Sequence, residues 1–264
     1  MLSSGGPDSV KEFVKSAKSD KSPLVRLAIA SALQRLPHDL RWPIVAELLA
    51  HAEDAADHNL PLMYWYGIEP LVAADPARAL GLASASKIEK VSRFIVRRAA
   101  AENGTLNAVL EALTKETLPR QLVLDEMFAA FEGRVNIPQP EAWTAAYEAL
   151  SKSDDAAMRD KADQIAVIFG DQRILPRLRA LLSDAKAPEA KRQQALEILV
   201  RGRDKDAAPA FQAAVADTAL RGAAIRALSA YDHEQTPAVL LAQYAKLSES
   251  EKRDAINTLC TRPS

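Results

Sequence analysis

The sequence predicts an all-α fold, and three observations predict it. Its 264 residues include only 9 glycines and 5% aromatic residues, too few for a sandwich or barrel of many short strands. Long segments rich in Ala, Leu, Arg, Glu and Lys favour helices. A helix-start pattern recurs at intervals of roughly thirty residues, the length of a helix, a turn and a second helix. We therefore expect an α-solenoid of about eight antiparallel helix pairs, the last one incomplete, that wind into a right-handed superhelix.

The clearest helix start lies between Asp20 and Leu33, where Asp-x-x-Pro-x-Val-Arg is followed by alanines at positions 28 and 32. An acidic residue before a helix accepts N–H groups of its first turn, and Pro at the first helical position loses no hydrogen bond. Apolar residues at i, i+3, i+4 and i+7 then form one buried stripe. This register is typical of HEAT-type repeats. Weaker copies, spaced by 33, 29 and 32 residues, contain Arg159, Arg192, Arg221 and Arg253. We assign these arginines to structure, with contacts to acidic residues of the adjacent repeat.

The other elements follow from the spacing of these starts. Residues 1–19 lack the register and are expected to form a partly flexible N-terminal segment. First helices without the clean register are expected at Leu60–Ala74, Ile88–Glu102 and Leu118–Phe131. Second helices fill the intervals, since each repeat buries its stripe only against neighbours. They are expected at Leu40–Ala50, Pro76–Ala83, Leu106–Leu113, Pro140–Leu150, Gln172–Leu182, Asp206–Ala216 and Glu234–Leu247.

One segment interrupts this array. Residues 133–140 contain two prolines and a glycine, where a helix cannot continue. The segment separates two halves of a single array over residues 1–264, or it is an ordinary inter-helix loop with an insertion; the sequence leaves both interpretations open.

Residues 57–72 do not fit a generic repeat. They contain one of the three tryptophans, two of the five tyrosines, and a glycine and a proline within an expected helix. Asp57 or Asn59 is available as the helix cap. Trp65 and Glu69, at i and i+4, share a helix face, which would suit a surface for a partner or ligand. The alternative is that Met63, Trp65 and Tyr66 fill the core where alanine is too small.

This segment also shows a family resemblance. Residues 57–72, together with 75–80 and 86–98, resemble the HEAT-repeat region of large multidomain PVC-type haem proteins, often labelled membrane-bound dehydrogenases. The likeness is close over residues 20–100. It implies that the repeats lie between a propeller similar to sugar dehydrogenases and a c-type cytochrome with CxxCH, and that the protein is periplasmic or exported. Neither flanking domain occurs in these 264 residues, so we expect a fragment of a larger haem-dependent protein.

The expected function is a non-catalytic scaffold or connector for proteins or neighbouring domains. The sequence contains no HExxH, GxSxG, GxxxxGK[ST], GxGxxG or CxxCH motif, so we expect no enzyme activity and no cofactor in this chain. The expected state is a monomer or weak dimer. The candidate partner-binding residues are His58, Tyr64, Trp65, Tyr66, Glu69, Arg93, Arg97 and Arg98.

A metal site was weighed at His51-x-x-Asp54-x-x-Asp57-His58, which has helical spacing. Mixed His and Asp ligands converge on a metal only where further side chains hold them by hydrogen bonds, so solvated loop residues are the favoured interpretation and no metal is expected. Cys260 is the only cysteine, which excludes a disulfide within these residues.

The charge pattern bears on the partner. The formal net charge of −1 gives no general attraction for nucleic acid, although a HEAT-like DNA glycosylase that uses Tyr64, Trp65 and Glu69 is the alternative function. Residues 50–86 hold five acids and one base, whereas residues 159–203 hold ten bases and six acids. This asymmetry is typical of a solvated surface, or it orients a charged partner. No apolar run approaches the ~20 residues that cross a bilayer, so no membrane insertion is expected.

Overall fold

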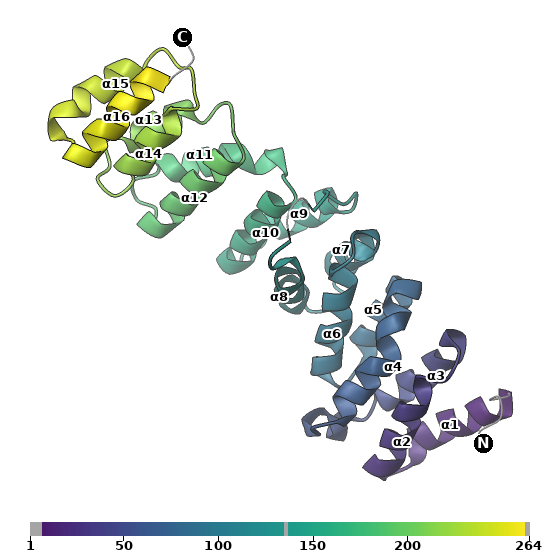
Figure 1. The fold of residues 1–264 in the computed structure, drawn as a ribbon. Coiled ribbons are helices and arrows are strands. Elements are labelled where there is room, and N and C mark those ends of the chain that lie inside the picture. Colours follow the sequence, from purple (N-terminus) through teal and green to yellow (C-terminus); the bar gives the residue numbers. More distant parts are fainter. Residues whose placement is uncertain (1–6, 135–136, 262–264) are drawn as a thin grey trace. The chain divides into compact units, whose positions relative to one another are not determined.

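A computed structural model describes residues 7–134 and 137–261, and in these ranges the chain is helical without a strand (Figure 1). The prediction of an all-α protein is confirmed. The α-helices are α1 (Pro7–Ser19), α2 (Pro23–Leu33), α3 (His38–Leu48), α4 (Leu60–Ala74), α5 (Pro76–Ala85), α6 (Glu89–Ala100), α7 (Leu106–Thr114), α8 (Arg120–Phe131), α9 (Trp143–Ser151), α10 (Ala156–Ile168), α11 (Leu175–Ser183), α12 (Glu189–Arg201), α13 (Ala208–Ala214), α14 (Arg221–Leu228), α15 (Thr236–Gln243) and α16 (Glu249–Thr261). Short 3₁₀-helices are η1 (Ala52–Ala56), η2 (Asn103–Thr105), η3 (Gln172–Ile174) and η4 (Tyr244–Lys246).

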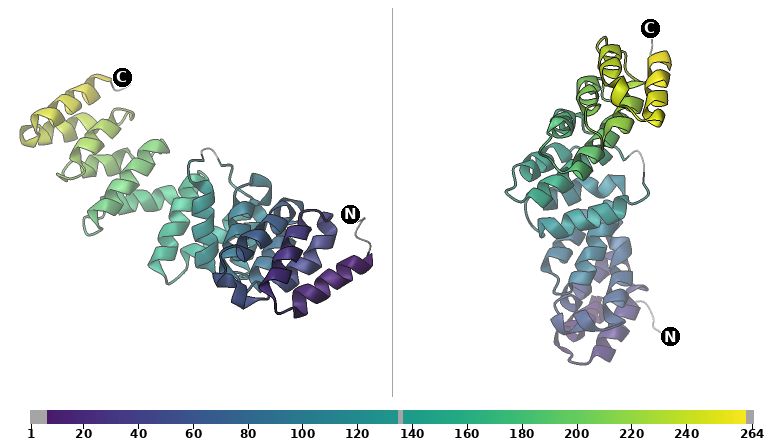
Figure 2. Two further views of the ribbon diagram at one scale, coloured as in Figure 1. Left: turned by 60° about the horizontal axis from the view of Figure 1, so that its bottom comes forward. Right: turned by 90° about the vertical axis from the view of Figure 1, so that its left-hand side faces the viewer.

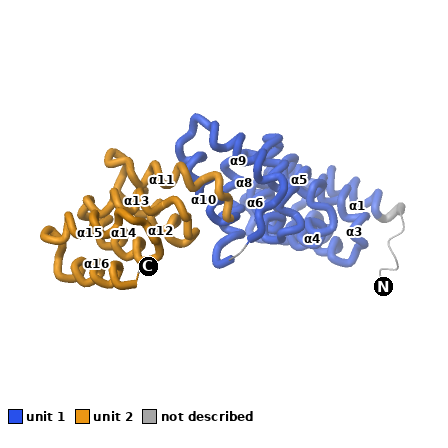
Figure 3. The backbone as a smooth tube through the Cα atoms, turned by 90° about the horizontal axis from the view of Figure 1, so that it is seen from above, with its two compact units in different colours: residues 1–169 blue, residues 170–264 orange. Residues whose placement is uncertain are grey.

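The helices form two compact units, unit 1 at residues 1–169 and unit 2 at residues 170–264 (Figure 3). The division therefore falls at Phe169 and Gly170 and not at residues 133–140, of which 135 and 136 lie outside the described residues. The described part of that segment packs within unit 1. Arg134 donates to the Ala100 carbonyl oxygen at 3.2 Å, and Ile137 is buried. The described part of that segment therefore lies within unit 1, and both interpretations of the segment stay predictions.

In unit 1, helices that alternate along the chain lie side by side (Figure 1, Figure 2). One series of contacts joins α2, α4, α6, α8 and α10, and other contacts join α1 to α3 and α5 to α7 to α9. Consecutive helices such as α5 and α6 also pack together. Helices of unit 1 thereby bury their apolar sides against helices before and after them in the chain.

Unit 2 repeats this contact pattern. Contacts join α11 to α13 and α12 to α14 to α16, while α11 packs on α12 and α13 on α14. Phe211 in α13 is fully buried and meets Tyr231 edge to face, with ring centroids 5.4 Å apart. The same two kinds of contact, to the next helix and to the next but one, therefore stabilise both units.

Part of the N-terminal segment is helical. Residues 7–19, expected to be partly flexible, form α1, which contacts α2 and α3, while residues 1–6 lie outside the described residues. Ala17 is fully buried, and its carbonyl oxygen lies 2.7 Å from His51 Nε2. The helix forms without the helix-start register because its residues pack against α2 and α3.

Several ion pairs join segments that lie 25 to 29 residues apart in the chain. Arg26 pairs with Asp54, and Arg192 Nη1 donates to Asp217 Oδ2 at 2.5 Å. Arg221 instead donates to the Val215 carbonyl oxygen, and Arg253 is exposed. Other pairs at this spacing are Arg98 with Glu69, Arg97 with Glu126 and Arg226 with Asp254. The expected arginine contacts thus occur at some of the register positions and also on helices without the register.

Candidate functional site

The predicted partner-binding residues of α4 lie on two opposite sides of the helix. Tyr64 is fully buried, whereas Tyr66 is 52% exposed and Trp65 is half-buried. Because successive residues of an α-helix are 100° apart, neighbouring aromatics point to different surroundings. The structure therefore divides this group into one core residue and two surface residues.

Tyr64 belongs to a buried polar cluster with Asp54 and Arg26. Its hydroxyl donates to Asp54 Oδ2 at 2.6 Å, and Arg26 Nε donates to the same oxygen at 2.7 Å. Burial raises the pKa of Tyr64, and the hydrogen bond to the carboxylate raises it further. The hydrogen bond to Asp54 likewise raises the pKa of Arg26. Tyr64 is thus a structural residue that joins α4 to η1 and α2. Because its side chain is fully buried, it does not lie on a surface that a partner could contact, as the sequence had suggested.

The surface side of α4 meets α6 through one aromatic contact and one ion pair. Trp65 packs against Phe94, with ring centroids 5.6 Å apart and ring planes at 49°. One turn along, Arg98 Nε donates to Glu69 Oε1 at 2.6 Å. The structure therefore brings Trp65, Glu69 and Arg98 together. We call the half-buried and exposed side chains Trp65, Tyr66, Glu69, Phe94, Arg97 and Arg98 the α4–α6 surface.

The arginines of α6 are neutralised by carboxylates. Arg93 Nη1 and Arg97 Nε donate at 3.0 and 2.7 Å to the two oxygens of Glu126, which comes from α8 and is 2% exposed. Arg98 also donates to Glu102. The hydrogen bond to Glu126, with that to Glu89, raises the pKa of Arg93. These arginines thus bind the helices of unit 1 to one another, and their charge is compensated locally.

Glu126 and Phe94 were missed as members of this cluster. The available signal was spacing, since Glu126 follows Arg93 and Arg97 by 33 and 29 residues, about one repeat. That spacing identifies neighbouring helices, but many residues of α8 share it. Only the packed structure shows which carboxylate lies between the two guanidinium groups.

His58 is exposed in the segment before α4, next to Asp57. Asp57 Oδ1 accepts hydrogen bonds from the backbone N–H groups of Asn59 and Leu60, both at 2.8 Å. The bonds from Leu60 and Asn59 lower the pKa of Asp57. Of the two predicted caps, Asp57 supplies the side-chain hydrogen bonds at the start of α4, whereas Asn59 occupies the N-cap position without a side-chain hydrogen bond.

Three residues of the His51–His58 motif form hydrogen bonds within the protein. His51 Nδ1 lies 2.7 Å from Glu53 Oε1, and its Nε2 is directed to the Ala17 carbonyl oxygen. Asp54 accepts from Arg26 and Tyr64, and Asp57 caps α4. Across residues 7–134 and 137–261, no group of three or more His, Cys, Asp or Glu side chains could hold a metal ion. Cys260 is exposed.

Within the described ranges, the helices are too short or too polar to cross a bilayer. In comparisons with family models, curated proteins and solved structures, none of the three gives a match to this chain.

Proposed function

We propose that this chain is a non-catalytic scaffold, built as a HEAT-like α-solenoid, that holds a protein partner or neighbouring domains. The alternating helix contacts of each unit and the ion pairs at one-repeat spacing support this architecture. In such an array, neighbouring repeats present aligned helices whose outer residues are free to vary, because the buried stripe alone maintains the stack.

The α4–α6 surface is the observation on which the proposal rests. Tyr66 exposes half of its side chain, and the residue before it, Trp65, packs on Phe94 and is itself partly exposed. Tyrosine and tryptophan are typical anchors of protein interfaces, since they bury a large area at a small cost in side-chain entropy. The surrounding ion pairs resemble the polar rim of an interface. A protein surface therefore fits this site.

The same ion pairs weigh against the DNA glycosylase alternative. Phosphate binding requires cations that are free to replace counterions. Here Arg98 is paired with Glu69 and Glu102, and Arg97 is paired with Glu126. The surface around Tyr66 and Trp65 consequently lacks the continuous basic groove that a nucleic-acid enzyme needs.

The resemblance to PVC-type haem proteins extends the proposal to the partner. In that reading the chain is a connector between a propeller and a c-type cytochrome, the natural position is periplasmic or exported, and haem chemistry belongs to the neighbouring domains. In that larger protein the chain would hold the neighbouring domains in position and orientation, and it would supply no reacting group.

The test combines gene sequence and binding. Any propeller or cytochrome domain encoded beside this chain is produced separately and titrated against it by isothermal calorimetry. Tyr66→Ala is expected to weaken binding by roughly tenfold or more, as for an interface anchor. Tyr244→Ala, a half-buried tyrosine of unit 2, is the matched control and should bind as the parent does.

Two results would overturn parts of this proposal. Stop codons on both sides of the chain would remove the connector role. Equal binding by Tyr66→Ala and the parent would remove the α4–α6 surface from the interface, because an exposed ring can be truncated without loss of the fold. Circular dichroism of both variants confirms that folding is retained.

A further inference from the structure

Unit 2 contains a groove that the proposed scaffold surface does not use. It has a volume of about 880 Å³ and lies where α12 and α14 end and α13 begins. A second hollow of about 460 Å³ continues it between α12 and α14, and the two share Val200 and Arg201. A groove of this size accommodates several residues of a bound chain.

Three exposed cations line the groove: Arg201, Arg203 and Lys205. None of them forms an ion pair with another described residue. Two of the neighbouring acids are already paired, since Arg179 Nη1 lies 3.0 Å from Asp204 Oδ1 and 3.1 Å from Asp206 Oδ2. This differs from the α4–α6 surface, where each arginine has a carboxylate. The groove therefore presents uncompensated positive charge.

The end of α12 accounts for only part of this charge. Arg201 lies in the last helical turn, where a cation complements the helix dipole. Arg203 and Lys205 lie beyond the helix. Arg203 also has a backbone φ of +49°, in the left-handed region that favours glycine and is unfavourable for residues with a side chain. An arginine is thus held at a position where glycine would be more stable.

The floor of the groove is apolar. Val200 is 40% exposed there, and Ala208 and Ala230 also line the groove. The Tyr231 ring lines the groove and is fixed edge to face on the buried Phe211. The ring is therefore a rigid wall, suited to packing against an apolar side chain.

We propose that this groove binds an acidic peptide segment of a partner protein, in which an apolar anchor residue lies between carboxylates. The carboxylates would face Arg201, Arg203 and Lys205, and the anchor would pack on Val200 and Tyr231. Asp232 and Glu197 line the same hollows, which limits the positive charge to a short stretch. A short stretch with an apolar floor fits a peptide better than the long phosphate backbone of a nucleic acid.

The probe is a fluorescein-labelled peptide of about ten residues with Glu and Asp on both sides of a Leu-Phe pair, added to the full chain. Fluorescence anisotropy should show saturable binding that weakens about three- to tenfold between 50 and 200 mM salt, since exposed charges are screened over ~10 Å. A peptide with Lys in place of the acids and one with Gly in place of Leu-Phe are the two ligand controls.

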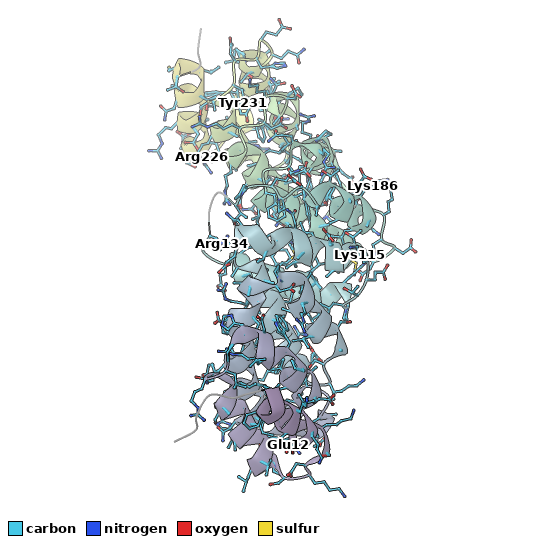
Figure 4. The ribbon with its side chains drawn as sticks, turned by 90° about the vertical axis from the view of Figure 1, so that its right-hand side faces the viewer. Glu12, Lys115, Arg134, Lys186, Arg226 and Tyr231 are labelled. Carbon is cyan, nitrogen blue, oxygen red and sulfur yellow. The ribbon has the colours of Figure 1, made fainter. Side chains whose placement is uncertain are left out.

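The key variants are Arg203→Gly and Val200→Asp. Arg203→Gly removes a charge while relieving the left-handed backbone, so weaker binding by about threefold or more would come with unchanged or higher thermal stability. Val200→Asp should abolish binding, because it places a carboxylate on the apolar floor. Lys186→Ala is the matched control; Lys186 is exposed before α12 and lies well apart from Arg226 and Tyr231 in Figure 4.

The outcomes separate the alternatives. The proposal would be overturned if the peptide showed no saturable binding. It would also be overturned if the Arg203→Gly and Val200→Asp variants bound the peptide as tightly as the parent protein does. Equal binding of a duplex oligonucleotide of the same charge would replace the peptide with nucleic acid. Tyr66→Ala should leave peptide binding unchanged, so this groove can fail or succeed independently of the α4–α6 surface.

Discussion

Gly67 offers a sharp test of the packing between α2 and α4. A methyl group at Gly67 would lie 2.6 Å from Leu33 Cδ1 and 3.0 Å from Leu33 Cβ, closer than carbon atoms approach in a packed core. Leu33 is fully buried, so its side chain cannot turn into solvent without loss of core packing. Gly81, in α5, is exposed and has no atom within 4 Å of the same methyl position. Both glycines therefore lie inside a helix, but only Gly81 has room for an added methyl group.

The expected free energies follow from this difference. Alanine gains ~0.5–1 kcal/mol over glycine inside a helix, and this gain applies to both positions. Overpacking at Gly67 costs ~1–3 kcal/mol and is absent at Gly81. Gly81→Ala should thus stabilise unit 1 slightly, whereas Gly67→Ala should be less stable than Gly81→Ala by ~1–3 kcal/mol.

Urea unfolding followed by tryptophan fluorescence measures this difference. All three tryptophans, Trp42, Trp65 and Trp143, lie in unit 1, so the signal reports on the unit that contains both glycines. The midpoint should shift while the slope with urea stays constant, since the area exposed on unfolding is nearly unchanged. Equal stability of the two variants would refute the close approach of α2 and α4.

Two further predictions concern ion pairs. Arg26→Met leaves the Asp54 carboxylate buried without its cation and should destabilise unit 1 by ~3–5 kcal/mol in the same fluorescence assay; a loss under 1 kcal/mol would show that water reaches the site. Hydrogen bonds from the Ala219 N–H and from Arg192 lower the pKa of Asp217 below its ordinary value of 3.8. Its stabilising contribution is therefore complete above pH 3.8 and disappears as the pH falls through the lowered pKa. Below about pH 4, hydrogen-exchange protection of α12 and α14 should fall less in the Asp217→Asn variant than in the parent protein. The same pH dependence of protection in both proteins would contradict this assignment.

Helix positions were largely predictable because their signals are local. Leu60–Ala74 is helical over its whole expected range, and the expected helices at Pro76 and Leu106 begin at those residues. Capping groups, prolines and apolar periodicity act within a few residues of the helix that they define. The helix expected from Pro140 begins at Trp143 instead, and the one expected up to Leu247 ends with the 3₁₀-helix η4.

The candidate site was harder to predict because it depends on distant residues. Tyr64 and Tyr66 have the same side chain and lie two positions apart, yet one is fully buried and the other is half exposed. The periodicity of α4 is weak, since apolar residues occur on all its sides. Contacts with Asp54, from a 3₁₀-helix earlier in the chain, decide which tyrosine is internal.

The opposite holds for the arginines of α6. The sequence marks them as a basic group, which suggests a surface for an anionic partner. Glu69 and Glu126 compensate Arg98 and Arg97 once the helices pack. Charge counted along the chain therefore differs from charge presented to a partner, whereas Arg201, Arg203 and Lys205 stay uncompensated in their groove.

The sequence by itself determined that this protein is helical and where most helices begin, because capping and periodicity are properties of short segments. It also indicated a repeat of roughly thirty residues. Only the tertiary structure decided that the chain forms two units divided at Phe169, that α1 covers α2 and α3, and which polar groups are paired. The physical reason is that burial and charge compensation depend on residues that are distant in the chain, and their side chains meet only after the helices have packed.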